Sequence, residues 1–346
     1  MDIKLFDYKL PSNLIAQKQI KPRDHSRLLV LDIASQKIAH KHFYDLVDYL
    51  TEDDVLVVNE TKVFPARLYG QKKTGGKVEI LLTERINTAE YQAMIGGRNL
   101  AVGDFIYLDK KLRAQIIKDI DGKTKQIKFD KSGKALDKII EAIGHTPLPP
   151  YIKTKDTQQI KKDYQTIYAK STGSVAAPTA GLHFTKKVLK QLEKKGVKIF
   201  KVTLHVSLGT FAPVEVSDIK KHKIHHEWAS IDQKTVDALN KLKKQSKNII
   251  AIGTTSARTL EAFSAKTGKL QSGDKWVDIY IYPGYKYRFV DDLITNFHLP
   301  KSSLLFMVSA LATRELIIKT YKKAVAKKYR FFSFGDAMFI SKNRLK

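Results

Sequence analysis

The chain begins with short apolar runs that predict buried strands. Residues 28–31 and 55–58 contain only leucine and valine, and each run is bounded by polar residues. Apolar runs of this length between polar boundaries are typical of strands inside a core. No tract is long and apolar enough to span a bilayer, so the pattern predicts an ordinary globular protein.

Between about residues 62 and 143 the pattern changes to short β-branched runs separated by turn signals. Asp121-Gly122, between two of these runs, suits a tight hairpin turn. Regularly spaced runs of this kind predict an all-β unit, here a small antiparallel barrel inserted into another domain. The runs cover residues 77–82, 91–95, 104–108, 114–119 and 125–129.

From about residue 144 onward strand-like and helix-like segments alternate, which predicts an α/β arrangement. Thr185 is a suitable N-cap for one helix, and Gly196 suits the left-handed position just beyond its end. Further helices are expected from Ser256 and over residues 302–329. Strands are expected at residues 197–206, 249–252, 278–282 and 331–334.

These patterns together predict an α/β main domain with an inserted small antiparallel β-barrel domain. The expected limits are residues 1–61 and 144–346 for a discontinuous α/β catalytic domain, and residues 62–143 for the barrel.

Composition narrows the chemistry. The chain has 346 residues, 43% of them hydrophobic, and no cysteine, which excludes disulfides, thiolate zinc sites, iron–sulfur clusters and cysteine nucleophiles. The first residues, Met1 to Lys4, lack the basic and apolar regions of a signal peptide. A cytoplasmic protein without a membrane partner is therefore expected.

The formal net charge of +27 indicates a polyanionic partner, because a basic surface concentrates and steers nucleic acid. Lysine greatly outnumbers arginine, and a lysine excess also arises from genome composition or from selection for solubility. The arginines are more informative, since a guanidinium binds phosphate or carboxylate through two hydrogen bonds and an ammonium does not.

The segment from Ser174 to Thr185 is a candidate ligand site. Its run of small residues, followed by a helix start, allows a ligand to approach the backbone and the first helical amides closely. His183 lies beside this stretch. The alternative is a plain loop with a capping threonine.

Two histidine-containing segments are further candidates. His205 lies at a strand end before a glycine-containing turn, residues 207–211, where a purely structural histidine is the common alternative. The stretch from His222 to Glu227 holds three imidazoles and a carboxylate, but without the HExxH spacing of a zinc site, so no metal is expected. Glu227 with a histidine is better suited to proton transfer.

Two predicted strand-to-helix junctions carry hydroxyl groups and charge. Thr254, Thr255 and Arg258 at the first junction suit a carboxylate, and His298 lies at the second, before Ser302. Ordinary helix caps are the alternative at both. Neither a G-x-G-x-x-G nor a P-loop motif is present, which disfavours a Rossmann-type methyltransferase or dehydrogenase and a nucleoside triphosphatase.

Several segments, in order and over nearly the whole chain, resemble the S-adenosylmethionine:tRNA ribosyltransferase-isomerase family of queuosine biosynthesis. Each segment is weak alone, and the ordered set is specific. They are Pro22-Arg23-Asp24-His25-Ser26-Arg27-Leu28-Leu29, residues 57–68, 144–152 and 164–169, the alanine-rich stretch through Thr185, residues 204–214 and 253–258, Ile281-Tyr282-Pro283-Gly284, Leu293-Ile294-Thr295-Asn296-Phe297-His298-Leu299-Pro300 and Phe334-Gly335-Asp336-Ala337.

A few positions depart from the family pattern. Lys62 stands where arginine is usual, and Ser207 where glycine is usual. Ile224 and His226 differ from the methionine and the small residue that usually flank the histidine between them. Most of these changes are modest in charge or size, so they bear on fine specificity.

The resemblance implies a reaction in which the ribosyl unit of S-adenosylmethionine is transferred to 7-aminomethyl-7-deazaguanine at the wobble position of a tRNA with a GUN anticodon. Adenine and methionine leave, and epoxyqueuosine forms. S-adenosylmethionine is consumed as a substrate, no other cofactor and no metal is expected, and a monomer is expected.

The same resemblance implies roles for particular residues. The proton-transfer candidates are His183, His205, Glu227 and His298. The candidate clamp for the methionine carboxylate is Arg258 with Thr254 and Thr255. The close-approach loop comprises Ala176, Ala177, Pro178, Thr179 and Gly181, and further substrate-binding candidates are Arg23, Arg27, Asn59 and Arg67.

Two other functions remain open at this stage. A non-catalytic RNA-binding protein would use the barrel and the basic charge alone, but would not require the small-residue loop or the histidines and glutamate. A methyltransferase would use S-adenosylmethionine differently and release S-adenosylhomocysteine.

Overall fold

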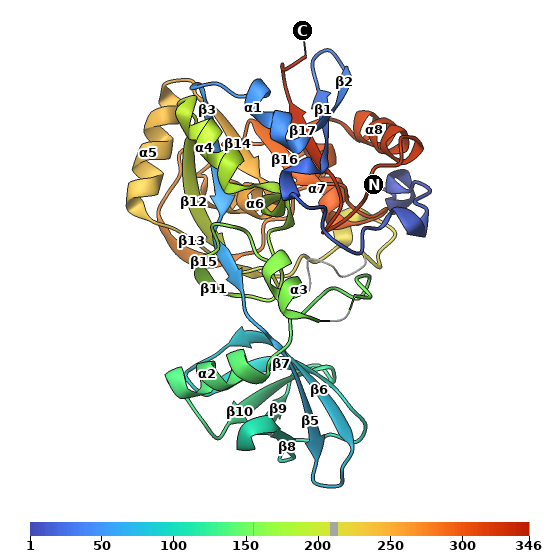
Figure 1. Ribbon diagram of the computed structural model, residues 1–346, viewed down its shortest axis with the longest axis vertical. Coiled ribbons are helices and arrows are strands. Elements are labelled where there is room, and N and C mark those ends of the chain that lie inside the picture. The colour runs from blue at the N-terminus through green and yellow to red at the C-terminus, as the bar shows by residue number, and fades with distance from the viewer. Residues whose placement is uncertain (155, 208–213, 346) are drawn as a thin grey trace.

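A mixed β-sheet forms the centre of the larger of two lobes in the computed structural model, which describes residues 1–154, 156–207 and 214–345 (Figure 1). The sheet has nine described strands and contains both parallel and antiparallel pairs. In spatial order they are β15 (Gly273–Val277), β13 (Glu227–Ile231), β12 (Lys198–Leu204), β3 (Asp54–Asn59), β14 (Asn248–Ile252), β16 (Asp292–Asn296), β17 (Ala337–Ser341), β1 (Arg27–Asp32) and β2 (Ile38–His42).

Both faces of this sheet are covered, which explains the uninterrupted apolar runs. Successive side chains of a strand point to opposite faces, so Val55 and Val57 of β3 enter one core cluster and Leu56 and Val58 another. The first cluster includes residues of α5 (Gln233–Lys244), α6 (Gly253–Phe263), α7 (Ser303–Leu311) and α8 (Arg314–Ala326), and the second includes residues of α1 (Leu46–Tyr49) and α4 (Lys186–Lys194).

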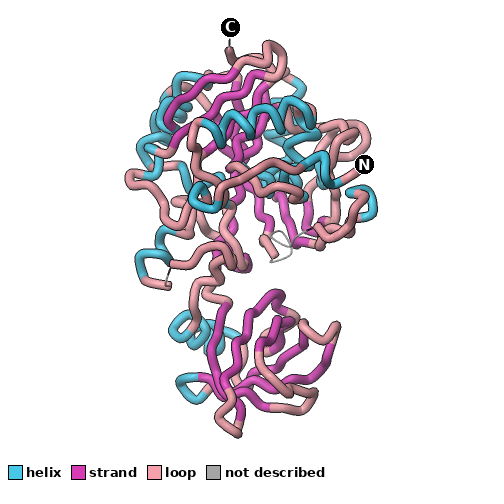
Figure 2. The backbone as a smooth tube through the Cα atoms, turned by 90° about the vertical axis from the view of Figure 1, so that its right-hand side faces the viewer, coloured by secondary structure: helices cyan, strands magenta, loops and turns pink. Residues whose placement is uncertain are grey.

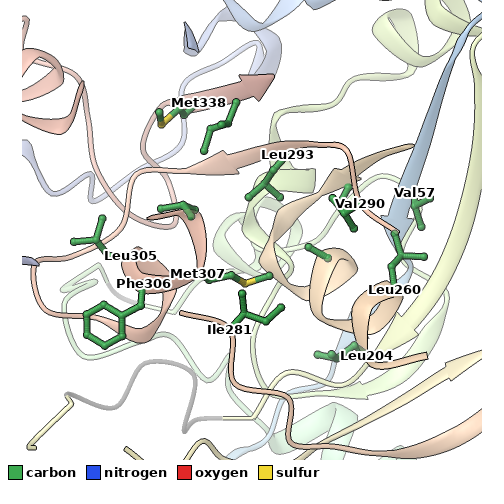
Figure 3. Close-up of a cluster of buried hydrophobic side chains, with 14 of the residues drawn as sticks. Val57, Leu204, Leu260, Ile281, Val290, Leu293, Leu305, Phe306, Met307 and Met338 are labelled. Carbon is green, nitrogen blue, oxygen red and sulfur yellow. The ribbon is translucent and has the colours of Figure 1, made fainter. Parts of the chain in front are cut away.

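Figure 3 shows part of the first cluster, where Val57, Leu260 of α6 and Leu293 of β16 lie in one apolar layer with Met307 and Met338. Fully burying one such side chain stabilises the fold by about 1.5–3 kcal/mol. This layer therefore fixes α6 against the sheet, and with it the residues at the N-terminal end of α6.

The smaller lobe is a closed antiparallel barrel, separated from the sheet in two views (Figures 1 and 2). Alternate side chains, such as Leu68 and Ile80, fill its interior. The fold class predicted from the sequence is confirmed. The barrel consists of β5 (Arg67–Lys72), β6 (Lys77–Arg85), β7 (Glu90–Gly96), β8 (Phe105–Leu108), β9 (Arg113–Asp119) and β10 (Thr124–Phe129), and α2 (Gly133–Ile143) follows it.

Short segments connect the lobes. β4 (Thr61–Val63) pairs in parallel with β11 (Ser171–Ser174), and Arg67 forms an isolated antiparallel bridge with His145. The helix α3 (Gln158–Asp163) lies between the lobes (Figure 1). Within the described residues, no helix has the length and hydropathy needed to cross a membrane.

The strand predicted at residues 331–334 is wrong. These residues are buried, but Phe332 has a left-handed backbone with φ 73°, and the amide of Gly335 turns back to the carbonyl of Phe332 at 2.9 Å. An apolar run indicates that the residues are buried, but it does not show that the backbone is extended. The strand of this region is β17, which begins at Ala337.

The expected strand at residues 278–282 is also absent, because β15 ends at Val277, where its pairing with β13 ends. The single helix predicted over residues 302–329 is divided into α7 and α8. Ala312 leaves helical geometry (φ −108°, ψ −90°), and the Thr313 hydroxyl starts α8 by accepting from the Leu316 amide at 3.2 Å.

The helix expected from Ser256 begins three residues earlier, at Gly253. Ser256 is not its cap, because its hydroxyl donates to the Ile252 carbonyl at 2.8 Å. The Thr185 cap is confirmed, since its hydroxyl accepts from the Val188 amide at 3.2 Å. Gly196 has φ 82°, in the left-handed region predicted for it.

Candidate functional site

A pocket lies at the carboxyl ends of the neighbouring parallel strands β14 and β16. In α/β sheets, ligands bind outside the carboxyl ends of the strands. Three segments that are distant in sequence meet there, together with a turn near residue 332. The lining residues are Ala177, Pro178, Thr179, Ala180, Val206, Gly253, Thr254, Thr255, Thr295, Asn296, Phe297, His298, Leu304, Phe332 and Ser333.

The small-residue loop forms one wall of this pocket. It continues into a short 3₁₀ helix, Thr179–His183, and Ala176, Ala177 and Gly181 are buried. Gly181 packs against the hydroxyl of Tyr168, which any added β-carbon would overlap. Glycine is therefore required there by packing, whether or not a ligand is bound.

His183 lies behind this wall, fully buried. Its Nδ1 is 2.7 Å from the Ser26 hydroxyl and its Nε2 is 3.2 Å from the side-chain nitrogen of Asn296. Burial, together with the charges of Arg330 and Arg23, lowers the pKa of His183 from 6.5 to about 3. The imidazole is neutral at physiological pH, and both of its nitrogens contact protein groups.

The first turn of α6 forms the opposite wall. Gly253 has φ 84°, a conformation that favours glycine, and brings the chain abruptly from β14 into the helix. Thr254 and Thr255 follow and line the pocket, near the unpaired amides that begin every helix. The Thr255 hydroxyl is buried and has no hydrogen-bond partner within the described residues.

His298 also lines the pocket. Its Nε2 lies 3.0 Å from the Thr295 hydroxyl, and its backbone carbonyl accepts a hydrogen bond from the Tyr8 hydroxyl. Burial lowers the pKa of His298 to about 3. This histidine is thus also neutral, and no group in the described part of the chain contacts its Nδ1 through a hydrogen bond.

Glu227 and Arg258 form a buried ion pair with each other. Glu227 also accepts a hydrogen bond from the Ser207 amide at 2.9 Å, and Arg258 approaches the Val277 carbonyl at 3.5 Å. Neither residue is among the described residues that line the pocket. The structure therefore brings these two candidates together, but behind the first turn of α6.

His205 is close to the pocket without lining it, although the next residue, Val206, does. Its Nδ1 is 2.8 Å from the Thr61 hydroxyl, and its ring stacks on Trp228 with centroids 4.9 Å apart. Burial lowers the pKa of His205 to about 4. Most of the glycine-containing turn predicted after it, residues 208–211, lies outside the described residues.

Two of the predicted arginines hold structure away from the pocket lining. The Arg23 guanidinium donates to the carbonyls of Gln165 at 2.6 Å and Lys162 at 2.9 Å. Arg27 lies over the Tyr329 ring, 3.7 Å from its centroid, and donates to a carbonyl in the same region.

Asn59 and Arg67 are likewise engaged in structural contacts. The Asn59 side chain both donates to and accepts from the backbone of Leu204, at 2.9 and 3.1 Å, so it fixes β12 beside β3. Arg67 belongs to the barrel, where it pairs with Glu79 at 3.3 Å and donates to the Leu148 carbonyl. Among the described lining residues, none of the four predicted substrate-binding positions just named appears.

Asn296, Thr295 and Ser333 line the pocket but were not among the predicted site residues. Asn296 is the last residue of β16, and a polar side chain at the end of a buried strand was the available signal. No comparable signal marks Ser333. The described residues contain no group of three histidines, aspartates or glutamates placed to hold a metal ion.

Comparison with known proteins agrees with this geometry. A model of the queuosine biosynthesis protein family matches residues 3–340. A solved structure of an S-adenosylmethionine tRNA ribosyltransferase from Thermotoga maritima is 33% identical in sequence, with 97% of this chain and 99% of that chain covered and a TM-score of 0.55. This chain therefore belongs to the queuosine biosynthesis protein family, the S-adenosylmethionine:tRNA ribosyltransferase-isomerases.

Proposed function

We propose that this protein transfers and isomerises the ribosyl moiety of S-adenosylmethionine onto 7-aminomethyl-7-deazaguanine at the wobble position of tRNA with a GUN anticodon. Adenine and methionine leave and epoxyqueuosine-tRNA is formed. One observation carries the proposal. The small-residue loop, the first turn of α6 and the segment from Thr295 to His298 converge on one pocket at the carboxyl edge of the sheet.

The chemistry requires a neutral base, a means to help adenine depart, and positioning of the methionine end. The positive sulfonium acidifies the adjacent 5′ carbon, so removal of a proton there gives an ylide. The ylide electrons open the ribose, and the bond to adenine breaks. The aminomethyl nitrogen then adds to the sugar, and the epoxide closes as the carbon–sulfur bond breaks and releases methionine.

His298 is the residue that best fits the proton-transfer role, because it lines the pocket and keeps Nδ1 without a protein partner within the described residues. His205 remains a second candidate at the pocket margin. His183 is better suited to positioning, since Ser26 and Asn296 contact both of its nitrogens.

For the methionine carboxylate we propose Thr254, Thr255 and the first amides of α6, where an anion is stabilised by the helix terminus. Arg258 would act on that carboxylate from behind the turn, with its charge shared by Glu227. We propose a structural role for the four predicted positions Arg23, Arg27, Asn59 and Arg67, which fix the segments around the site through hydrogen bonds to backbone atoms. They hold the elements that the tRNA and the nucleoside approach.

The tRNA is proposed to bind across the pocket entrance and the barrel, attracted by the net charge of +27. A monomer located in the cytoplasm remains our prediction.

The test is a product assay with S-adenosylmethionine and precursor tRNA. The proposed reaction releases adenine and methionine in equal amounts, one of each per modified tRNA. Release of S-adenosylhomocysteine would identify a methyltransferase instead. Tight tRNA binding with neither product would identify a protein that only binds RNA.

A further inference from the structure

Asn296 presents a buried polar atom that no group in the described part of the chain satisfies. The residue ends β16, is 3% exposed and lines the pocket. Its amide oxygen, Oδ1, has no hydrogen-bond partner within the described residues. Buried polar atoms are almost always paired in native proteins, and an unpaired one at a site is commonly completed by a ligand.

The orientation of this amide is fixed by chemistry. The side-chain nitrogen of Asn296 lies 3.0 Å from the backbone carbonyl of Phe332. A carbonyl only accepts hydrogen bonds, so the atom facing it must be the nitrogen. The unpaired atom is therefore the oxygen, which can only accept.

His183 fixes the second hydrogen of the same amide. Its Nε2 is 3.2 Å from the Asn296 nitrogen, and a nitrogen that receives a hydrogen bond must be unprotonated. The proton of the neutral ring then lies on Nδ1 and is donated to the Ser26 hydroxyl at 2.7 Å. His183 and the Phe332 carbonyl thus occupy both hydrogens of the Asn296 amide, with Ser26 fixing the His183 ring. Oδ1 is left free to accept a hydrogen bond from another group.

The surroundings select the kind of donor. The described residues that line the pocket include no aspartate or glutamate, so a cationic donor would find no countercharge there. Apolar side chains, including Phe297 and Leu304, line the same pocket. A neutral donor on a largely apolar group fits both features.

We propose that Asn296 Oδ1 accepts a hydrogen bond from the adenosine half of S-adenosylmethionine, whose neutral donors are the adenine amino group and the two ribose hydroxyls. His183 is a positioning residue for this acceptor. The inference rests on the proposed function only in assigning S-adenosylmethionine to the pocket. It adds the residue that discriminates among nucleosides.

The experiment measures binding of four thioether probes that cannot form the ylide. They are S-adenosylhomocysteine and its analogues with purine in place of adenine, with 2′-deoxyribose and with 3′-deoxyribose. Each is titrated calorimetrically into the full chain and into Asn296→Ala. The control variant is Asn248→Ala, which removes an asparagine whose nitrogen is also fully engaged, with Asp54 and Asp292, at the other end of β14.

We expect one analogue to bind the unmodified protein about tenfold more weakly than S-adenosylhomocysteine, the effect of one lost hydrogen bond. Asn296→Ala should bind S-adenosylhomocysteine about tenfold more weakly, and should not distinguish it from that analogue. This non-additivity identifies a direct contact. His183→Ala should reduce the same discrimination, and Asn248→Ala should retain it.

Equal binding of all four probes to the unmodified protein would overturn the inference, and that measurement needs no variant to fold. The inference would also be overturned if Asn296→Ala still bound the analogue about tenfold more weakly than S-adenosylhomocysteine, because the effects of the variant and of the analogue would then be independent. The product assay fails separately. Adenine release without donor discrimination refutes the acceptor alone, whereas discrimination without adenine release refutes the proposed reaction alone.

Discussion

The two lobes differ in the polar groups that they bury. In the larger lobe, His183, Arg258 and Asn296 are buried near the carboxyl edge of the sheet. From β5 to α2, a stretch that the structure describes in full, Lys125 is the one buried polar side chain, and its Nζ pairs with Asp119 at 2.5 Å. Burying polar groups costs stability unless they are paired, so we propose that those near the carboxyl edge of the sheet are retained for the chemistry of the site.

The barrel instead presents polar and aromatic groups outward. Tyr69 and Phe105 are 52% and 44% exposed on neighbouring strands. Exposed aromatic rings are surfaces on which bases stack. From this difference we propose that the nucleoside chemistry takes place in the larger lobe and that the barrel makes part of the RNA contact.

The largest expected effect is a difference in salt dependence between tRNA binding and S-adenosylhomocysteine binding. If about six phosphates are neutralised, tRNA affinity should fall about 10³-fold between about 50 and 200 mM salt. Binding of S-adenosylhomocysteine, for which we propose contacts with buried groups, should change little. Filter binding and calorimetry measure the two. A parallel salt dependence of both would break the division between the lobes.

The second effect concerns the buried ion pair. Arg258→Met leaves the Glu227 carboxylate buried without its guanidinium, which should lower the free energy of unfolding by about 3–5 kcal/mol. The matched control is Arg314→Met, whose partner Glu315 is exposed, with an expected change under about 1 kcal/mol. Urea denaturation measures both.

Equal stability of these two variants would show that Glu227 does not depend on Arg258. The predicted carboxylate clamp would then be the better description of Arg258, provided that the affinity for S-adenosylmethionine falls.

The third effect is a pH dependence. The unfolded chain protonates His183 near pH 6.5, whereas the folded chain does so only near pH 3. The stabilisation that comes from keeping His183 neutral in the folded protein is present in full above pH 6.5 and is lost as the pH falls toward 3. Removing it with His183→Gln should shrink the stability difference between pH 7.5 and pH 5 by about 2 kcal/mol.

Thermal and urea unfolding at both pH values check this expectation. An unchanged pH profile in His183→Gln would mean that the imidazole is protonated inside the protein, and the assigned hydrogen-bond directions would fail with it.

The smallest expected effect tests the barrel surface. Tyr69→Ala should weaken tRNA binding by about 1 kcal/mol, roughly fivefold, if a base stacks on the ring. Trp276→Ala removes a ring that is equally exposed, at 51%, on the sheet edge of the larger lobe, and should leave tRNA affinity unchanged. The reverse pattern would move the RNA contact away from the barrel.

Local patterns accounted for most of the fold. The run at residues 55–58 predicted β3, and Asp121-Gly122 predicted the turn between β9 and β10. The strands β2, β4, β5, β11, β13 and β16 were not predicted, and β15 and β17 lie outside the ranges predicted for their parts of the chain. β13 and β16 pair with strands distant in sequence, as in the pairing of β13 with β12 and β15. β5 pairs with β6, the next strand along the chain, but its sequence, Arg67-Leu68-Tyr69-Gly70-Gln71-Lys72, holds no apolar run that would predict a strand.

The sequence predicted which segments form the candidate site better than it predicted the role of each residue in them. The small-residue loop, Thr254, Thr255 and His298 do converge on one pocket. That Arg258 would meet Glu227 was not predictable, because the two are separated by 31 residues and belong to different elements. Only the assembled structure distinguishes a charge facing a pocket from one that is already paired.

Photoaffinity labelling tests the division between the lobes most directly. The full chain would be irradiated with an azidoadenine form of S-adenosylhomocysteine, with and without excess S-adenosylmethionine, and the labelled peptides identified by mass spectrometry. We expect competed label within residues 177–180, 253–255 or 295–298, which line the pocket. Competed label confined to the barrel, residues 67–143, would contradict the assignment of nucleoside chemistry to the larger lobe.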